Sequence, residues 1–329
     1  MHKERRSSIF SFRKARVIWP LLIWGVGFLS TASILSWIRH STHRATEASL
    51  SFPEEVESKA VSLVYDGHRA MDHYLYFHNR EGGLDHAKRA DVLLLGNSRV
   101  LCGLDASRLE TYRQRTGTSF YNLGFGYDEG GAFPLLLIKR YELRPKLVVV
   151  NADASFWEEA TPLAREVVQS RPWKVGVEFA EFTGAWHLRR SIHRWLPKLI
   201  SPEKIAIWRC HRDGSWIVRT SETKHLAVSY VQGASLTGER AAMLAAARDW
   251  KRKLDQLGIG LAITLVPSPD SDYSLAETIG TDLGVPTILA PIDSRFETFD
   301  GDHLDAESAQ RFTSIFLDQF EDLGLEEAL

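Results

Sequence analysis

Short apolar runs alternate with helical patterns along most of the chain, and this alternation restricts the fold more than any other feature. The runs Asp91–Leu95 and Lys146–Val150 are continuous and rich in branched residues, as in strands that are buried on both faces of a parallel sheet. Strands that alternate with helices form open parallel sheets with right-handed crossovers. The expected strands are 91–95, 118–122, 146–150, 258–267 and 287–291, with helices at 105–116, 130–141, 238–257, 273–283 and 311–320.

A run of 22 residues without a charge, Val17–Ile38, precedes this region. As a helix it spans about 33 Å at about 1.5 Å per residue, enough for a bilayer core of about 30 Å. Cations are concentrated before it, and the positive-inside rule therefore places the N-terminus in the cytoplasm. We expect an uncleaved signal anchor in the inner membrane, with the C-terminal domain periplasmic; a cleaved signal peptide or a buried helix is the alternative. The preceding cations are Lys3, Arg5, Arg6, Arg13, Lys14 and Arg16, and Arg39 and Arg44 follow.

The expected organisation is a basic tail at 1–16, an anchor at 17–38, a stalk and lead-in helices at 39–89, and an α/β domain at 90–329. Histidines and aromatic residues are dense in 61–89, but their spacing fits no zinc signature, which favours ordinary helix and loop residues. An insertion of about 155–237 holds six tryptophans and a basic run. It is interpreted either as a glycan-binding surface of aromatic and cationic side chains or as a small helical subdomain whose tryptophans form its own core.

The composition argues against several classes of function. The net charge of -2 gives no electrostatic footprint for nucleic acid. The two cysteines, Cys102 and Cys210, fit no zinc or iron–sulfur spacing, and free thiols are favoured over a disulfide. Neither a dinucleotide nor a P-loop glycine pattern follows the first strand. We therefore expect no cofactor and no metal.

Two segments about 200 residues apart offer the chemistry of a serine nucleophile. Ser98 follows the first strand at a sharp turn for which Gly96 is suited, and its amide lies near a helix N-terminus. His303 follows the fifth strand at the same edge of the sheet, with Asp300 three residues earlier. Together they supply a nucleophile, a base and an orienting acid. Alternatively, Ser98 merely caps its helix, and His303 is a surface residue beside a cap formed by Asp302 or Asp305.

On these residues the chain resembles the SGNH (GDSL-type) hydrolase superfamily over about 90–325 without the insertion. It resembles more narrowly the membrane-anchored members associated with acylation of cell-surface polymers such as alginate and teichoic acid. The resemblance rests on Leu-Leu-Leu-Gly-Asn-Ser-Arg at 93–99, Tyr-Asn-Leu-Gly at 121–124 and Asp-Gly-Asp-His at 300–303. It implies a flavodoxin-like three-layer sandwich, Ser98 as nucleophile, His303 as base and Asp300 as orienting acid. It also implies an oxyanion hole of Ser98, Gly124 and Asn151.

Two departures from the family pattern bear on activity. The first block reads Gly-Asn-Ser instead of Gly-Asp-Ser, which leaves the nucleophile in place. In the third block Asn151 lacks the usual preceding glycine, and Asp153 places a carboxylate where it would repel an oxyanion. The resemblance implies an extracytoplasmic esterase or O-acyltransferase acting on acyl esters, such as acetyl esters, of a cell-surface polysaccharide. A membrane-bound acyltransferase or an export protein is an implied partner. The altered third block keeps open a second hypothesis, a non-catalytic scaffold in a polysaccharide assembly complex.

Overall fold

The computed structural model describes residues 61–65, 70–126, 129–195, 205–220, 226–230 and 237–327. The chain divides into two compact units. The larger, 58–183 with 201–329, contains every strand that the structure describes and the candidate site. Of the smaller, 1–57 with 184–200, the described part is the end of one helix. The expected basic tail, the anchor at 17–38 and the stalk up to residue 60 therefore lie outside the described residues.

A five-stranded parallel sheet forms the centre of the larger unit. Its order is β3-β2-β4-β8-β9, which is the flavodoxin-like order in which the second strand along the chain lies at one edge. Every residue of β2 and β4 is buried, which explains why these two runs are continuously apolar. The α/β prediction of five parallel strands is confirmed. The strands are β2 (Val92–Leu95), β3 (Phe120–Asn122), β4 (Leu147–Asn151), β8 (Gly260–Thr264) and β9 (Thr287–Ile288).

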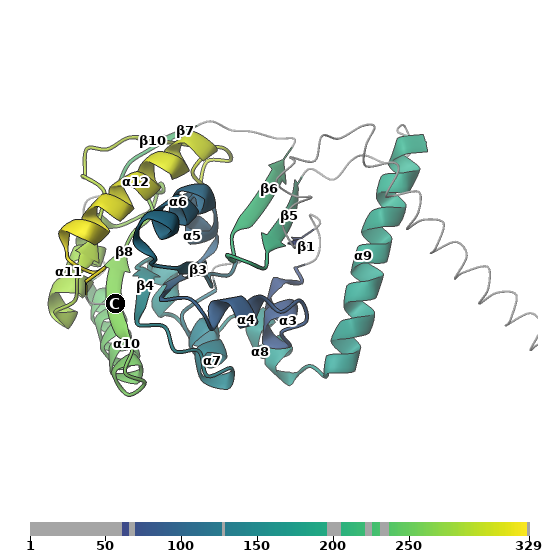
Figure 1. The fold of residues 1–329 in the computed structure, drawn as a ribbon, viewed down its shortest axis with the longest axis horizontal. Helices are drawn as coiled ribbons and strands as arrows, with labels where there is room; N and C mark the ends of the chain where they lie inside the picture. The colour runs from purple at the N-terminus through teal and green to yellow at the C-terminus, as the bar shows by residue number, and fades with distance from the viewer. Residues whose placement is uncertain are drawn as a thin grey trace, which may run out of the picture. The chain divides into compact units, whose positions relative to one another are not determined.

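Helices cover both faces of this sheet (Figure 1). On one face, α5 (Ser98–Gly103), α6 (Ala106–Thr116) and α12 (Ala306–Asp322) pack against one another. On the other lie α7 (Ala132–Arg140), α10 (Thr237–Asp255) and α11 (Tyr273–Leu283). Aspartates cap α6, α11 and α12 by accepting a backbone N–H of the first turn. The result is the expected three-layer sandwich, with the ends of β2 and β4 facing the loops that carry the candidate site.

Residues 61–89 differ from the expected lead-in helices, because they begin with a strand. β1 (Val61–Tyr65) is followed by the short helices α3 (Asp72–Phe77) and α4 (Gly83–Ala87). β1 pairs antiparallel with β5 (Ile205–Cys210), which pairs with β6 (Trp216–Thr220). The partner of β1 thus lies within the insertion, far along the chain. The α/β unit accordingly begins before the expected boundary at Ala90.

The insertion contains strands as well as helices. Besides β5 and β6 it includes the 3-10 helix η1 (Ala154–Trp157), α8 (Pro162–Gln169), α9 (Pro172–Trp195) and β7 (Leu226–Val228). Trp157, Trp186 and Trp208 are buried, whereas Trp173 is 67% exposed. The tryptophans therefore serve mainly as packing residues, as the second interpretation expected, although the insertion is not purely helical.

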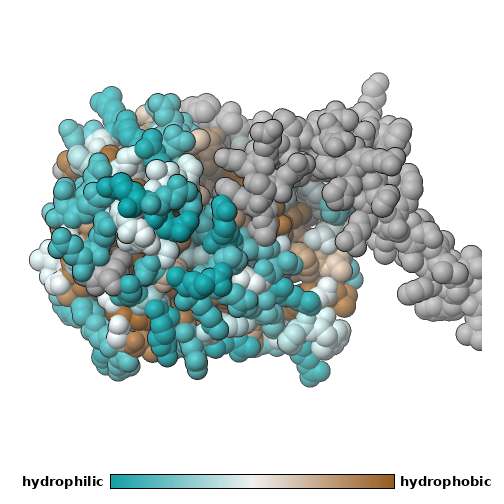
Figure 2. Space-filling model, viewed as in Figure 1, coloured by the Kyte–Doolittle hydropathy of each residue, from teal (hydrophilic) through white to brown (hydrophobic). Residues whose placement is uncertain are grey.

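Hydrophilic side chains cover most of the coloured surface in Figure 2. Within the part of the chain that the structure describes, no helix is both long and apolar enough to span a bilayer. Cys102 and Cys210 are both free, as the sequence favoured, and the second is buried.

A buried arginine of the insertion connects the small antiparallel sheet to the central one. Arg209 of β5 is fully buried and pairs with Asp72 of α3, Nη1 to Oδ2, at 2.6 Å. The same guanidinium donates to the carbonyl oxygens of Asn122, at 2.7 Å, and Gly124, at 2.8 Å, and lies over the rings of Tyr76 and Phe125. It thereby fixes the backbone that follows β3.

We expect Arg209→Met to lower the free energy of unfolding by about 3–5 kcal/mol, because the Asp72 carboxylate would stay buried without its cation. Urea unfolding of the full chain measures this change. The control Arg108→Met, at an exposed position of α6, should change stability by about 0.5 kcal/mol or less. A loss below about 1 kcal/mol for Arg209→Met would contradict the role assigned to the buried pair.

Candidate active site

Ser98 is the first residue of α5, directly after the turn that ends β2. Asn97 caps this helix, since its Oδ1 accepts the Arg99 N–H at 3.0 Å. The alternative in which Ser98 is the cap is therefore wrong, and its hydroxyl is left for another partner. Gly96 lies against β4, where a Cβ atom at position 96 would come within 2.8 Å of the Asn151 Cβ. Glycine is thus required for the close approach of this turn to the neighbouring strand.

His303 lies on a tight loop that an antiparallel strand pair holds in place. β10 (Phe296–Thr298) pairs with β7 of the insertion, and the Phe299 N–H donates to the carbonyl oxygen of His303 at 3.0 Å. Within the loop, Asp300 Oδ1 accepts the N–H groups of Asp302 and His303 at 3.0 and 2.9 Å. The ring of Phe299 stacks on the imidazole, with centroids 5.7 Å apart. Backbone and ring contacts together fix the orientation of His303.

The three side chains predicted from the sequence are brought together in a line. His303 Nε2 lies 2.7 Å from Ser98 Oγ, and His303 Nδ1 lies 2.7 Å from Asp300 Oδ2. The distances fit a tautomer whose Nδ1–H donates to Asp300 and whose Nε2 accepts the Ser98 hydroxyl proton. The imidazole is 19% exposed and Ser98 is partly exposed, so the hydroxyl does not point into the core. Asp305 caps α12 as the alternative expected, but His303 faces Ser98.

The Asp300 carboxylate is stabilised in its ionised form. Burial alone would raise its pKa, but the hydrogen bonds from the ring and backbone of His303 outweigh burial and lower the pKa to about 2. An ionised partner at this position favours the imidazolium that forms when His303 takes a proton.

Arg99, which the sequence analysis did not single out, joins three loops around Ser98. Its guanidinium contacts Asp153 after β4 at 2.9 Å, Asp270 after β8 at 2.6 Å and Asp302 beside the base at 2.8 Å. Arg99 is 12% exposed, Asp153 is 6% exposed, and the other two carboxylates are open to solvent. The sequence offered a signal for this contact: Arg99 directly follows Ser98, and aspartates follow several of the expected strands.

Asp153 does not stand as an isolated carboxylate beside the nucleophile. Arg99 pairs with its Oδ1, while its Oδ2 accepts the side-chain amides of Asn97, at 3.0 Å, and Asn151. Burial raises its pKa, against the opposing effect of Arg99. The repulsion of an oxyanion expected from the sequence is therefore compensated within the protein.

The expected oxyanion donors have internal partners. Gly124 lies beside the nucleophile turn, where a Cβ atom would come within 2.9 Å of the Gly96 carbonyl oxygen, but its N–H donates to Asn122 Oδ1 at 3.1 Å. Asn151 is fully buried; its amide donates to Asp153 and its Oδ1 accepts the Val266 N–H at 2.7 Å. The Ser98 N–H, at the first position of α5, belongs to the helical donors that lack an intrahelical acceptor.

Two of the histidines of 61–89 have ordinary partners. His73 is buried and contacts Glu129 at 3.1 Å, and His78 contacts Ser170 at 3.0 Å. Among the described residues, no group of three or more His, Cys, Asp and Glu side chains is placed to hold a metal ion.

The pKa of Asp300 makes stability depend on acid pH. A carboxyl group with a folded pKa near 2 and an ordinary unfolded value near 3.9 stabilises the fold above pH ~4, and this contribution is lost as pH falls through about 2. We expect Asp300→Asn to cost about 1–2 kcal/mol at pH 6, a discounted figure because the carboxylate is 32% exposed. Denaturant unfolding between pH 6 and 2 should show the difference from the unmodified chain shrinking; a constant difference would contradict the linkage.

Comparisons with known proteins identify a distant structural likeness. No protein-family model and no curated protein matches the chain. Among solved structures, the chain is similar to a GDSL-like lipase from Bacteroides thetaiotaomicron at 12% identity and a TM-score of 0.38. The match covers 78% of this chain and 100% of that one. A likeness at this level carries no argument about activity, which has to be drawn from the site itself.

Proposed function

We propose that the chain is a serine esterase or O-acyltransferase of SGNH type. The observation that carries the proposal is the line of contacts from Ser98 Oγ through His303 to Asp300, with both distances at 2.7 Å. Side chains from segments 200 residues apart meet at the carboxyl edge of a parallel sheet, where active groups gather in open α/β folds. An accessible hydroxyl within hydrogen-bond distance of an oriented imidazole is the arrangement that nucleophilic acyl transfer requires.

The proposed reaction has two halves. Ser98 Oγ attacks the carbonyl carbon of an ester while its proton moves to His303 Nε2. The tetrahedral intermediate collapses, the alcohol leaves with the proton from His303, and an acyl-Ser98 ester remains. Water or a sugar hydroxyl then gives its proton to His303 and attacks the acyl carbon. The bond between the acyl carbon and Ser98 Oγ breaks, a carboxylic acid or a new ester leaves, and His303 returns the proton to Ser98 Oγ. Hydrolysis and transfer use the same residues and differ only in this second nucleophile.

The negative charge that develops on the carbonyl oxygen in the transition state needs hydrogen-bond donors. The Ser98 N–H is one donor; Gly124 adds a second only if its N–H leaves Asn122 Oδ1. The loss of one oxyanion donor costs about 3–4 kcal/mol of transition-state stabilisation, roughly a factor of 10² to 10³ in rate. We therefore expect substrate binding to turn the Asn122 side chain away from the Gly124 N–H, while Arg209 keeps the carbonyl groups of both residues in place.

The finer features of the proposal follow from the sequence. The uncharged run at 17–38, with its preceding cations, supports a single-pass tether that holds the domain on the periplasmic side of the inner membrane. A tethered enzyme is suited to a polymer that is made or exported at that membrane. We propose acylated, in particular acetylated, cell-surface polysaccharide as the substrate and a membrane-bound acyltransferase or export protein as a partner.

The alternative function is a non-catalytic scaffold in a polysaccharide assembly complex. The observation in its favour is that Gly124 and Asn151, the expected oxyanion donors, both have internal acceptors. Such a scaffold would retain the fold and the contacts of Ser98 without an activated nucleophile.

We expect a fluorophosphonate probe to label Ser98 of the full chain, because an oriented imidazole makes the hydroxyl a nucleophile. Mass spectrometry of the adduct identifies the residue. Labelling should disappear in Ser98→Ala and fall at least about 100-fold in His303→Ala. The matched control Ser107→Ala, an exposed serine of α6, should label like the unmodified chain. Equal labelling with and without His303 would refute the mechanism, and a folded chain that never labels would favour the scaffold.

The base and its orienting acid should differ in importance. Asp300→Asn should reduce the labelling rate by about one to two orders of magnitude less than His303→Ala, since the orienting acid contributes less than the base. The labelling rates of the two variants are measured at pH 7 from time courses in which the reaction is quenched at intervals. Equal losses would mean that Asp300 also maintains the structure of the loop, which unfolding measurements on the same variants would reveal.

A further inference from the structure

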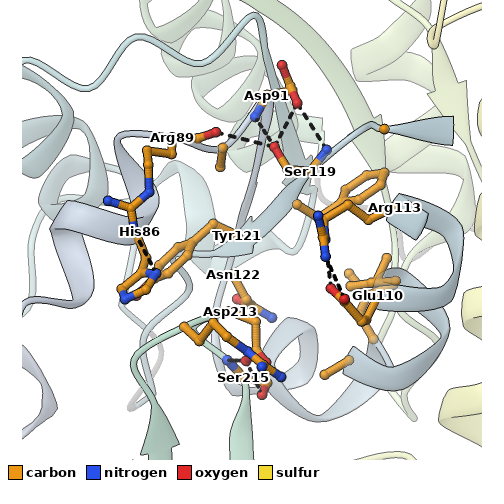
Figure 3. A pocket seen from close by; sticks show the side chains of 17 residues that line it. His86, Arg89, Asp91, Glu110, Arg113, Ser119, Tyr121, Asn122, Asp213 and Ser215 are labelled. Carbon is orange, nitrogen blue, oxygen red and sulfur yellow. Dashed lines mark hydrogen bonds and ion pairs between the residues drawn. The ribbon is translucent and has the colours of Figure 1, made fainter. Parts of the chain in front are cut away.

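A cavity of about 490 Å³ lies along the outer edge of β3, away from the candidate active site. Its volume is within the range of about 300–1,000 Å³ for small-molecule sites. In Figure 3, His86 and Arg89 form one side, Glu110 and Arg113 the opposite side, and Asp213 and Ser215 a third. None of Ser98, Asp300 and His303 lines it. Its existence follows from the strand order, because β3 is the edge strand and α4, α6 and the β5–β6 turn surround its free side.

Two of the three acids that line the cavity are paired with cations. Glu110 accepts two hydrogen bonds from Arg113 at 2.8 and 2.7 Å, and these bonds lower the pKa of Glu110 to about 2. Asp91 pairs with Lys146 at 3.0 Å and accepts the Ser119 hydroxyl at 2.7 Å. The charges of these groups are therefore satisfied within the protein. Asp213 is the third acid, and its Oδ1 is occupied by the Ser215 backbone and hydroxyl.

Two arginines of the cavity have no carboxylate partner among the described residues. Arg89 donates to His86 Nδ1 at 2.9 Å, and the pKa of this imidazole is lowered, first by burial and then by Arg89 itself, so His86 is a neutral acceptor. Arg212, in the β5–β6 turn, is exposed and its guanidinium has no hydrogen bond or ion pair with any described residue. The charge of Arg212 acts on both His86 and Glu110, which lie on opposite sides of the cavity. Arg212 lines the cavity, and its donors are available to a ligand there.

The lining below these cations is partly apolar. Ala106 and Leu109 of α6 and Phe120 of β3 are half-buried and contribute carbon surface to the cavity. A ligand that satisfied only the guanidinium groups would leave this surface in contact with water. Ligand sites commonly combine such a surface with a few convergent polar groups. Arginine is also the side chain best suited to carboxylate and phosphate groups, because its fork of N–H donors matches two oxygens.

We propose that this cavity binds a small organic anion, with its carboxylate or phosphate group held by Arg89 and Arg212 and its apolar face over Leu109 and Phe120. The site is separate from the proposed catalytic centre and does not depend on Ser98. It shares β3 with the loop that carries Gly124, and Asn122 lines the cavity while its side chain accepts the Gly124 N–H. An occupant of the cavity would accordingly lie next to the strand end that positions this loop.

Isothermal titration of the full chain in non-ionic detergent tests the proposal with four probes: benzoate, phenyl phosphate, inorganic phosphate and benzamide, the neutral analogue of benzoate. We expect benzoate or phenyl phosphate to bind, and the stronger of the two identifies the anionic group. Benzamide and inorganic phosphate should bind at least fivefold more weakly. The double variant Arg89→Gln with Arg212→Gln should weaken binding at least fivefold, whereas the control Arg108→Gln, an exposed arginine outside the cavity, should not change it.

Three results would overturn the proposal: no binding of either organic anion, binding of inorganic phosphate as strong as that of phenyl phosphate, or binding that the double variant leaves unchanged. Repeating the titration with Ser98→Ala separates this site from the active site. Binding that persists in Ser98→Ala supports a separate site. Binding that is lost there but survives the double variant would place the anion at the catalytic centre and refute the inference, whatever the labelling of Ser98 shows.

Discussion

The geometry of the site depends most on the ion pairs that the Arg99 guanidinium makes. The guanidinium extends from the residue after the nucleophile and meets carboxylates from the loops after β4, β8 and β10. Loops at the carboxyl edge of a parallel sheet have no strand partner to fix them, and a shared cation supplies the constraint that the sheet does not. Asp302 is adjacent to His303, so this contact also limits the distance between His303 and Ser98.

A second cation, the buried Arg209, performs the same task for the backbone at the end of β3. Arg209 reaches from the insertion to the backbone after β3 and fixes the carbonyl groups on either side of Leu123. Its carboxylate partner, Asp72, comes from a helix that precedes the central sheet in sequence. The parts of the chain outside the α/β core are thus coupled to the site through one desolvated ion pair. Breaking such a pair is costly because either group alone would remain buried and charged.

The sequence predicted the elements that are determined by local residue patterns. Continuous apolar runs indicated β2 and β4, and the convergence of strand ends at one edge led to Ser98, Asp300 and His303. It could not predict β1, because the partner strand of Val61–Tyr65 lies in the insertion. The oxyanion donors illustrate a different limit. The motif locates Gly124 and Asn151 near Ser98, but the acceptors of their N–H groups are the side chains of Asn122 and Asp153. Arg209 is a single charge in an apolar strand, and only the tertiary structure shows that its partner is Asp72.

The pairing of β7 with β10 makes the insertion a support for the loop that carries Asp300 and His303. β10 leads directly into Asp300 and His303, and three residues of the insertion form its neighbouring strand. Thr298 reinforces the pair, as its hydroxyl donates to the Leu226 carbonyl oxygen at 3.0 Å. A strand of three residues at a sheet edge has little independent stability. The loop that carries His303 therefore depends on the insertion as well as on its own contacts. Without Leu226–Val228, β10 would lose its partner strand, and the loop would keep only the hydrogen bonds to Asp300 and the stacking of Phe299.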